Sequence, residues 1–318
     1  MMKCLVTGAA GFIGSNLVDR LLAAGHQVVG FDNFSTGQER FLQAALGSPA
    51  FRLERADLLD LSAVERAADG VDIVYHLAAN ADVRFGPDYP RRDLEQNAIA
   101  TWNVLEAMRR QGVGRMAFSS TGSVYGEAKI IPTPEDSPFP VQTSLYGASK
   151  LAAEGLIEAY SEAFGIQAFI FRFVSILGRR YTHGHVFDFY KQLLEHAGTL
   201  RVLGDGKQRK SYLALEDCLD AILLAVERAA GRVNIFNLGA GEYCEVNHSI
   251  SWITNHLGLT PELDYQGGDR GWIGDNPFIW LDCSRMRSLG WKPRFSIREA
   301  VIQTLEYLQA EPWLLHAR

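Results

Sequence analysis

The feature that most constrains this chain is a glycine-rich turn near its start, between a short apolar run and an amphipathic stretch. Gly8, Gly11 and Gly14 follow the apolar run Lys3–Thr7, and the residues after them carry apolar side chains at helical spacing. Glycines allow a tight turn and a close approach of the backbone to a pyrophosphate, and a helix N-terminus adds free N–H groups with a partial positive charge. The pattern therefore predicts a strand–turn–helix unit that binds phosphate.

An acidic residue follows this turn at the spacing expected for a ribose contact. The next apolar run ends in Asp32, roughly 20 positions beyond Gly14, where a carboxylate accepts a hydrogen bond from the adenosine 2′-hydroxyl. A carboxylate at this position repels a 2′-phosphate, and the neighbouring residue is Asn33 rather than an arginine. The sequence therefore predicts NAD, not NADP, as the cofactor.

Short apolar runs alternate with longer amphipathic stretches as far as about residue 175, which is typical of a doubly wound parallel α/β sheet of the Rossmann type. The expected strands are Lys3–Thr7, Gln27–Phe31, Phe51–Arg55, Ile73–His76, Arg115–Ser119 and Gln167–Arg172. The expected helices are Ser15–Ala24, Leu61–Ala68, Asn97–Gln111 and Tyr146–Phe164.

Beyond Gly178 the pattern loosens into segments rich in glycine, proline and aromatic residues. We therefore expect a Rossmann domain over 1–177 and a smaller α/β substrate-binding domain over 178–318. Residues 212–238 regain strand and helix character, and we expect them to rejoin the first domain.

Composition excludes several classes of function. A chain of 318 residues with 47% hydrophobic residues can form one large or two ordinary domains, and a formal charge of −6 without long charged runs argues against nucleic acid or an anionic membrane as partner. The sequence has no long apolar span, so we expect a cytoplasmic protein. Its four cysteines lack Cys-x-x-Cys spacing, which favours structural thiols over disulfides or a zinc site.

Tyr146 and Lys150 form a candidate acid/base pair. In a helix, residues four apart share a face. A free tyrosine has a pKa near ~10, so a phenolate at neutral pH needs positive charge beside it, which Lys150 and an oxidised nicotinamide together would supply. A tyrosine and a lysine at this spacing are also common on exposed helices, so the rest of the chain must support the assignment.

Five motifs occur in one order along the chain: Thr7-Gly8-x-x-Gly11-x-x-Gly14, Asp32, His76-Leu-Ala-Ala79, Ser119-Ser-Thr121-Gly-Ser-Val-Tyr-Gly126 and Tyr146-x-x-x-Lys150. With them the chain resembles the extended short-chain dehydrogenase/reductase family over essentially its whole length, and most of all the UDP-sugar 4-epimerases. The resemblance implies that Tyr146 is the general acid/base, that Lys150 binds the nicotinamide ribose and lowers the pKa of Tyr146, and that Thr121 positions the sugar hydroxyl.

The resemblance also implies two sets of binding residues. Those for NAD are Gly8, Gly11, Phe12, Ile13, Gly14, Asp32, Asn33, Asp57, Leu58, Leu77, Ala78, Ala79, Asn97, Ser119, Tyr146 and Lys150. Those for the UDP-sugar are Thr121, Ser123, Tyr146, Ser175, Arg209, Lys210, Arg270 and Ile279. Taken alone, Asp57 is better explained by a helix N-cap and His76 by a core histidine.

The activity implied is inversion of a UDP-sugar at C4 through a transient 4-keto intermediate, with tightly bound NAD accepting and returning the hydride. Related 4,6-dehydratases carry Asp-Glu after the active-site threonine and related decarboxylases a glutamate at the second of these positions, whereas this chain has Gly122 and Ser123. The missing carboxylates favour an epimerase over a dehydratase or another keto-forming member. A non-catalytic NAD-binding regulator is less consistent with the presence of Tyr146, Lys150 and Thr121.

The sequence leaves the substrate open among UDP-glucose, UDP-N-acetylglucosamine, UDP-glucuronate and their galacto forms. Ser175 stands where many relatives have asparagine, and Lys210-Ser211 where they have Arg-Asp. Either Arg209 or Lys210, together with Arg270, would bind the diphosphate. Ile279 aligns with a position that limits the size of the sugar, and isoleucine is of intermediate size there.

Two further expectations concern metals and assembly. His183, His185 and Asp188 lie close together in sequence, but we expect no metal because the hydride chemistry needs none. The resemblance implies a homodimer joined by a four-helix bundle, which would use Asn97–Gln111 and Tyr146–Phe164 of each subunit.

Overall fold

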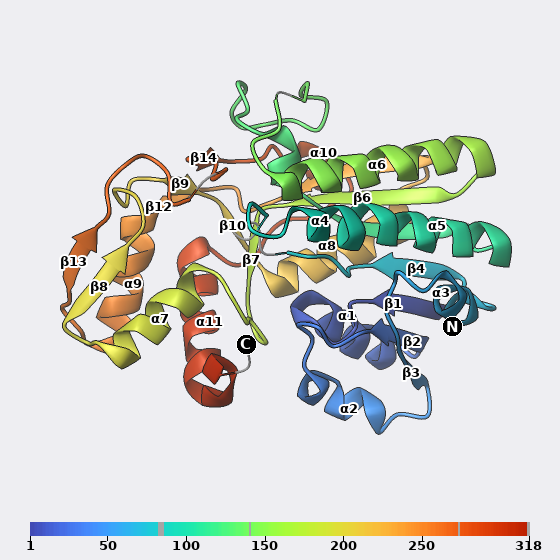
Figure 1. Cartoon of the computed structure of the whole chain (residues 1–318), viewed down its shortest axis with the longest axis horizontal. Coiled ribbons are helices and arrows are strands. Elements are labelled where there is room, and N and C mark those ends of the chain that lie inside the picture. The colour runs from blue at the N-terminus through green and yellow to red at the C-terminus, as the bar shows by residue number, and fades with distance from the viewer. Residues whose placement is uncertain (82–85, 140, 273, 317–318) are drawn as a thin grey trace. The chain divides into compact units, whose positions relative to one another are not determined.

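A computed structural model describes residues 1–81, 86–139, 141–272 and 274–316 of the chain (Figure 1). Its residues form two compact units. Unit 1 comprises Met1–Val124, Ser144–Arg172 and Ile222–Phe236, and unit 2 comprises Tyr125–Thr143, Phe173–Ala221 and Asn237–Arg318.

Unit 1 is built on a seven-stranded sheet with the strand order β11-β6-β5-β4-β1-β2-β3. The pairs β1–β2, β1–β4, β2–β3 and β4–β5 are parallel. β1 lies between β2 and β4, so the strand order reverses beside it, and ligands of such sheets bind at this point. The strands are β1 Lys3–Thr7, β2 Gln27–Asp32, β3 Phe51–Arg55, β4 Ile73–His76, β5 Arg115–Thr121, β6 Gln167–Phe173 and β11 Val233–Leu238.

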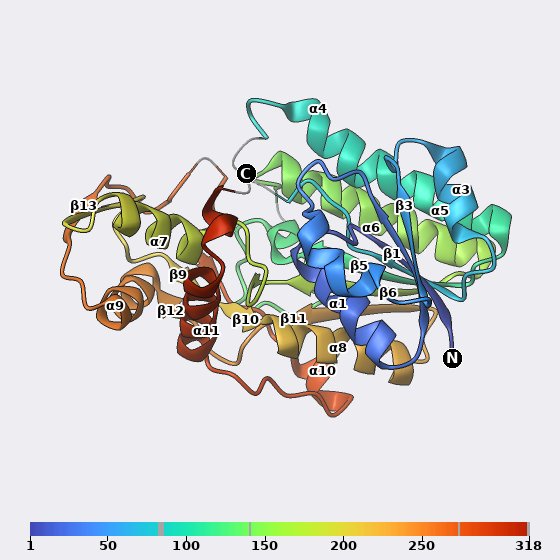
Figure 2. The same ribbon diagram turned by 90° about the horizontal axis from the view of Figure 1, so that it is seen from below.

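Helices cover both faces of this sheet (Figure 2). α1 (Phe12–Ala23) lies on one face, and α3 (Leu61–Ala68), α5 (Ala100–Gln111) and α6 (Leu145–Phe164) lie on the other. The central strands are almost continuously apolar because both faces are buried. The core on the α3, α5 and α6 side includes Leu5, Val74, Val104, Met116 and Ile157.

The predicted Rossmann-type fold is confirmed, with two differences in its helices. α1 begins at Phe12, earlier than expected, because Gly11 adopts the extended conformation of an N-cap. The predicted helix Asn97–Gln111 is wrong in part: α4 (Pro90–Asp93) leads into a π-helical turn over Leu94–Ile99, and only then does α5 begin. The Thr101 side chain donates a 2.5 Å hydrogen bond to the Asn97 carbonyl, which competes with the regular backbone ladder at this turn.

Unit 2 contains three small sheets. They pair β7 (Ser175–Leu177) with β10 (Tyr212–Ala214), β8 (Thr199–Val202) with β13 (Glu262–Tyr265), and β12 (Cys244–Glu245) with β9 (Arg209–Lys210) and β14 (Phe278–Ile279). Its helices are α7 His185–Glu195, α9 Val246–Leu257, α10 Ser284–Ser288 and α11 Ile297–Ala310, and α8 (Leu215–Arg228) is divided between the two units.

The segment Tyr125–Thr143 belongs to unit 2, although both of its ends continue into unit 1. The Tyr125 hydroxyl donates to Asn237 Oδ1 at 2.8 Å, and Asn237 Nδ2 donates to the Thr133 carbonyl at 2.8 Å. The Thr133 N–H donates to the Trp280 carbonyl at 2.9 Å. Sequence periodicity gives no sign of these contacts, and the predicted domain ranges stay predictions.

Within the described ranges, no helix combines the length and the apolar character needed to cross a bilayer. Cys4, Cys218, Cys244 and Cys283 are free and buried, as expected of structural thiols. Burial raises the pKa of the Cys4, Cys244 and Cys283 thiols to about 12. These thiols are therefore protonated and poor nucleophiles near neutral pH.

Candidate active site

The glycine turn between β1 and α1 is so tight that side chains are excluded from it. Gly8 has φ +70°, and a Cβ on it would lie 2.8 Å from the backbone nitrogen of Ala78. A Cβ on Gly14 would lie 2.0 Å from the Gly8 carbonyl oxygen. Glycine is required at both positions, because any side chain would push the start of α1 away from the ends of β1 and β4.

The N-terminus of α1 is open to an anion. Among the described residues, no side chain caps Gly11, and the first turn, which begins with Phe12 and Ile13, contains no acidic residue. The first N–H groups of a helix lack intrahelical partners and carry the positive end of its dipole. This turn can therefore hold a pyrophosphate, as its sequence predicts.

Asp32 lies beside the turn at the end of β2. Its Oδ2 accepts a 2.9 Å hydrogen bond from the Ala10 N–H, and its Oδ1 accepts a 2.8 Å bond from the Phe34 N–H. Burial raises the pKa of Asp32 and these two N–H groups oppose that rise. The two bonds thus hold the Asp32 carboxylate beside the glycine turn, at the carboxyl end of β2.

Asn33 and Asp57 come together beside Asp32. Asn33 Nδ2 donates to Asp57 Oδ2 at 2.8 Å. The N-cap interpretation of Asp57 is wrong, because the side chain that caps α3 is that of Asp60, which accepts from the Ala63 N–H at 3.2 Å.

The residues after β4 contact β1, and Ser119 of β5 contacts the end of β4. Leu77 and Ala78 donate through their N–H groups to the carbonyl and the hydroxyl of Thr7, each at 3.3 Å. Ser119 donates to the His76 carbonyl at 3.3 Å. Ala79 follows Ala78, and Leu58 is buried beneath α5, with its carbonyl accepting from Asn103 at 2.7 Å.

His76 is a core histidine with a defined tautomer. Thr101 donates its hydroxyl proton to the Asn97 carbonyl, so it accepts from His76 Nε2 at 3.0 Å. His76 Nδ1 then accepts from the Thr7 hydroxyl at 2.7 Å. Burial, and to a smaller extent the nearby charge of Lys150, lowers the pKa of His76 to about 3. The ring is therefore neutral.

Tyr146 and Thr121 meet through their side chains. Tyr146 lies in the first turn of α6 and hydrogen-bonds the Thr121 hydroxyl at the end of β5. Ser123 is joined to Thr121, since its N–H donates to Thr121 Oγ1 at 3.1 Å. Burial raises the pKa of Tyr146 to about 12, the Thr121 bond opposes this rise and Asp93 adds to it.

Lys150 follows Tyr146 by one turn of α6 and is 1% exposed. Its Nζ lies 4.1 Å from the centroid of the Phe118 ring. Burial lowers the pKa of Lys150 to about 7, and the Glu154 carboxylate opposes this effect. The four-residue spacing thus places partly buried Tyr146 and fully buried Lys150 one turn apart, both with altered pKa values.

Asn97 joins the π-helical turn to α6. Its Nδ2 donates to Ser149 Oγ at 2.9 Å, and Ser149 Oγ donates to the Tyr146 carbonyl at 2.8 Å. Asn97 Oδ1 accepts from the Asn80 N–H at 2.9 Å, and Asn80 Nδ2 donates to Asp93 Oδ1 at 2.8 Å. This network holds the first turn of α6, where Tyr146 lies.

Sequence reasoning missed Ser149 and Asp93 of this network, and also a buried group formed by Glu154, Arg172 and Ser120. The available signal was that Ser149 and Glu154 lie on the same helix as Tyr146 and Lys150. Arg172 was visible as a charged residue in an apolar strand.

In unit 2, two of the three predicted diphosphate ligands lie near Asp275. Lys210 Nζ donates to Asp275 Oδ1 at 2.6 Å and also to the Asn276 carbonyl. Arg270 Nη1 donates to the Asp275 carbonyl at 3.4 Å, and its Nη2 forms an ion pair with Glu127.

Arg209 is separated from this pair because consecutive strand residues point to opposite faces of a sheet. Its guanidinium lies 3.8 Å from the centroid of the Phe278 ring and 5.9 Å from that of Tyr243. Ile279 is the register partner of Lys210 in β14, whereas Ser175 lies exposed at the start of β7, in a different sheet. Unit 2 thus brings together Lys210, Arg270 and Ile279.

The histidine segment of unit 2 has structural contacts. His185 Nε2 bonds Ser249 Oγ at 2.8 Å, and its ring lies 4.4 Å from that of Tyr212. The His183 ring stacks on Tyr181. Across the part of the chain that the structure describes, no group of three or more His, Cys, Asp or Glu residues is placed to hold a metal ion.

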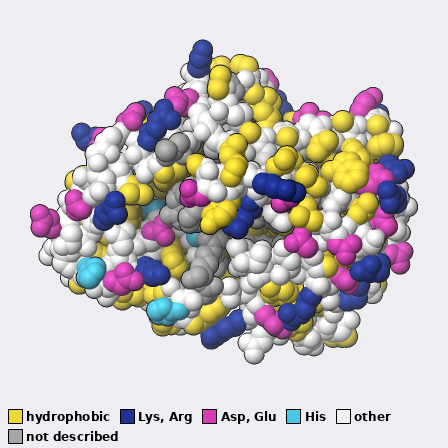
Figure 3. Space-filling model, in the orientation of Figure 1, with side chains coloured by type: hydrophobic (Ala, Val, Ile, Leu, Met, Phe, Trp, Pro, Cys, Tyr) yellow, Lys and Arg dark blue, Asp and Glu magenta, His cyan; other side chains and the backbone are white. Residues whose placement is uncertain are grey.

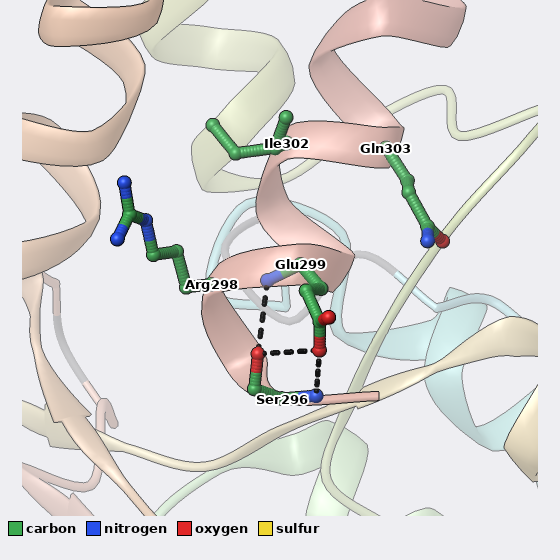
Figure 4. Close-up of a pocket in the computed structure, with 5 residues that line it drawn as sticks. All are labelled: Ser296, Arg298, Glu299, Ile302 and Gln303. Atoms are coloured by element: carbon green, nitrogen blue, oxygen red, sulfur yellow. Dashed lines mark hydrogen bonds between the residues drawn. The ribbon is translucent and has the colours of Figure 1, made fainter. Parts of the chain in front are cut away.

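A shallow pocket lies along the first turns of α11 (Figure 4). Ser296 and Glu299 bond each other there in a capping box, so their polar atoms serve the start of the helix. The remaining lining residues are Arg298, Ile302 and Gln303, and none of the residues predicted for the site is among them.

Comparison with known proteins gives one consistent family. UDP-glucose 4-epimerase from Mycolicibacterium smegmatis is 33% identical over 314 residues, which cover 97% of this chain and 99% of that protein. The crystal structure of UDP-glucuronic acid 4-epimerase from Bacillus cereus, in complex with UDP-glucuronic acid and NAD, is 29% identical with a TM-score of 0.90, and the match covers 98% of this chain and 100% of that one.

Relatives with another activity are also similar. UDP-glucuronic acid decarboxylase 3 from Arabidopsis thaliana is 31% identical over 311 residues, covering 94% of this chain and 87% of that protein. A family model described as NAD dependent epimerase/dehydratase matches residues 4–239, which include the glycine turn, Asp32, Tyr146 and Lys150. These matches confirm the resemblance and NAD as the cofactor of the family, and the chain belongs to the NAD dependent epimerase/dehydratase family.

Proposed function

We propose that this protein interconverts the two C4 epimers of a UDP-sugar, with Tyr146 as the acid/base. The observation that carries the proposal is the arrangement of partly buried Thr121 and Tyr146 and fully buried Lys150 at the carboxyl end of β5 and the start of α6. A secondary alcohol next to this group would find a hydroxyl to orient it, a phenol to take its proton and a cation to favour the phenolate.

The residues present fit NAD. The uncapped start of α1 suits its pyrophosphate, and the carboxylate of Asp32 suits its adenosine ribose. Asn33 and Asp57, which are paired beside Asp32, would lie next to the adenine. Lys150 and Asn97 would lie next to the nicotinamide and its ribose. When bound, NAD supplies a reversible acceptor for the hydrogen and electron pair of a C–H bond.

Tyr146 would be the group that moves the proton. In the chain alone burial raises its pKa to about 12, so a phenolate near neutral pH requires positive charge close by. Protonated Lys150 would supply part of it. The C4 hydroxyl proton would pass to Tyr146 as the carbon is oxidised to a ketone, and the same proton would return when the ketone is reduced on its other face.

The residues after Thr121 support an epimerase over the related eliminations. Gly122 and Ser123 occupy the places where dehydratases carry two carboxylates and decarboxylases one. The Ser123 side chain accepts from the Thr121 hydroxyl at 3.2 Å. A hydroxyl orients a sugar but is a poor base for removing a C5 proton.

In unit 2 we assign the diphosphate to Lys210 and Arg270 rather than to Arg209. The first two both bond Asp275, through its carboxylate and its carbonyl, whereas Arg209 lies on the opposite face of β9 against aromatic rings. Ile279, beside Lys210, would then contact the sugar. UDP-glucose, UDP-N-acetylglucosamine and UDP-glucuronate are the candidate substrates.

We also propose a homodimer through α5 and α6. Figure 3 shows hydrophobic side chains gathered over these helices. Several large apolar side chains of α5, α6 and the π-helical turn before α5 are exposed, which is unusual unless a partner covers them. Among them are Leu94 at 54%, Trp102 at 40%, Leu145 at 45% and Phe164 at 52%. Sedimentation of the wild type should give a dimer and that of Trp102→Glu a monomer; a monomeric wild type would contradict the proposal.

The function is tested by incubating the purified protein with each candidate UDP-sugar, without added cofactor, and following the C4 configuration by NMR. Interconversion of gluco and galacto forms of at least one sugar is expected. A stable 4-keto-6-deoxy product would indicate a dehydratase and a pentose product a decarboxylase, and either would overturn the proposal.

A further inference from the structure

An ion pair between Glu154 of α6 and Arg172 of β6 is buried in unit 1. Arg172 Nη2 lies 2.7 Å from Glu154 Oε2, and Arg172 Nε lies 3.1 Å from Oε1. The side chains are 1% and 2% exposed. Ser120 also donates a hydrogen bond to Glu154 Oε1. The carboxylate is therefore fixed from two strands, β5 and β6, as well as by its own helix.

Such a pair is weak evidence for stability, because removing two ions from water costs roughly as much as their attraction returns. Apolar residues of similar volume would fill the same space at the sheet–helix interface. Since the pair lies one helical turn beyond Lys150, its charges act on a group that the reaction uses.

The Glu154 carboxylate favours the protonated form of Lys150. Lys150 is buried, it faces the Phe118 ring, and burial alone favours its neutral form. Tyr146 and Glu154 lie one helical turn before and after it on α6, His76 on β4 is close enough to respond to its charge, and Arg172 on β6 is the positively charged partner of Glu154. His76 is neutral and Tyr146 is protonated in the chain alone, so Glu154 is the negative charge beside the lysine.

We propose that Glu154 is a positioning residue that keeps Lys150 protonated, and that Arg172 and Ser120 hold its carboxylate in place for this task. The proposal rests on the proposed function, which gives protonated Lys150 its role. It also explains the contact with Ser120: because Ser120 precedes Thr121, one anchored carboxylate fixes both the end of β5 that carries Thr121 and the turn of α6 that follows Lys150.

The direct test is the ionisation of Lys150, followed by NMR of side-chain-labelled lysine in the purified protein, with its signal assigned by its loss in Lys150→Arg. Glu154→Gln should lower the Lys150 pKa by about one pH unit or more, because it removes a charge at helical i+4 distance from a poorly solvated cation. Glu154→Asp, which keeps the charge, should stay within a few tenths of a pH unit of wild type.

The matched control is Glu158→Gln, which removes an exposed carboxylate one turn further along α6 and should leave Lys150 unchanged. Glu154→Gln also leaves Arg172 buried without its partner. The double variant Glu154→Gln/Arg172→Met removes both charges and should fold more stably than the single variant. Its Lys150 pKa should be lowered less than in Glu154→Gln, because loss of the Arg172 charge favours protonated Lys150. A purely structural pair would leave the Lys150 titration at its wild-type position in the folded single variant as well as in the double variant.

Activity supplies a second readout. If protonated Lys150 is required, the fall in turnover at alkaline pH should move to lower pH in Glu154→Gln by the same amount as the NMR pKa. An unchanged Lys150 pKa in a folded Glu154 variant overturns this inference even if the protein is an epimerase. A shifted pKa in a protein that converts no UDP-sugar supports the inference about Glu154 and instead refutes the proposed function.

Discussion

The two units treat the charges of the candidate site in different ways. In unit 1, Lys150 and Asp32 are buried and surrounded by fixed partners of the same unit. In unit 2, Lys210 is paired with Asp275, and Arg270 with the exposed Glu127. Unit 1 therefore holds its reactive groups in one arrangement, whereas the cations of unit 2 would have to exchange or share their acidic partners when a diphosphate binds.

The largest expected effect tests the fixed arrangement of unit 1. Tyr146→Phe removes the proton-transfer group while leaving the glycine turn and Asp32 intact, so we expect turnover to fall by about 10³-fold or more with NAD binding retained. Steady-state rates and the NAD content of the denatured protein measure the two parts. Turnover near that of wild type would remove Tyr146 from the proposed role.

The next effect tests the exchangeable pairs of unit 2. Arg270→Gln should raise the KM for the UDP-sugar by roughly 10-fold or more with little change in kcat, because a charged hydrogen bond to phosphate is lost. Glu127→Gln is the matched variant, since it frees Arg270 from its acidic partner, and its KM should be unchanged or lower. A higher KM in Glu127→Gln would show that the ion pair itself organises the site.

A third comparison uses the histidine with a lowered pKa in each unit, fully buried His76 and partly buried His185. Burial lowers the pKa of both His76 and His185 to about 3, below the ~6.5 of an unfolded chain. Their contribution to stability is therefore complete above pH 6.5 and is lost as the pH falls from 6.5 towards 3. Each histidine should contribute up to about 1.4 kcal/mol per pH unit to this loss.

Urea unfolding of His76→Asn and His185→Asn between pH 7 and pH 4.5 measures these contributions. Each variant should be less stable than wild type at pH 7 but lose stability less steeply on acidification. A variant whose stability depends on pH as steeply as that of wild type would show that protonation of that histidine is not the cause.

The smallest expected effect concerns the buried thiols, which report on the units separately. Cys4 lies in unit 1, and Cys218, Cys244 and Cys283 lie in unit 2. Because these thiols react only when their surroundings open, UDP at a few times its Kd should slow labelling in unit 2 by a few-fold and leave Cys4 unchanged. Equal slowing of all four would show that the units open together.

The residues that the sequence singles out in unit 1 lie near one another in the structure because their signals are local. The Gly8 turn requires glycine for steric reasons, Asp32 ends a strand that the turn precedes, and Tyr146 and Lys150 share a helix. The contacts of Ser149, Asp93 and Glu154 were not predictable, because each partner comes from an element far away in the chain. The π-helical turn Leu94–Ile99 was also not predictable. It contains a hydrogen bond from the Thr101 hydroxyl to the Asn97 carbonyl, which apolar periodicity does not reveal.

In unit 2 the motifs predict three candidate cations for the diphosphate without deciding among them. Strand alternation in β9 separates Arg209 from Lys210, but it becomes informative only when β14 and the Asp275 loop are placed beside that strand. Short strands and glycine-rich loops carry little periodicity, so their pairing depends on tertiary contacts that a single sequence does not show.

The central claim is that the C4 hydrogen leaves the sugar and returns to the same carbon. It is tested most directly by incubating a UDP-sugar substrate deuterated at C4 with the purified protein in ordinary water and examining both epimers by NMR and mass spectrometry. We expect the deuterium to remain at C4 in both epimers, with none lost to solvent. Loss of the deuterium to water, or its transfer to C6 of a keto-sugar, would contradict the account.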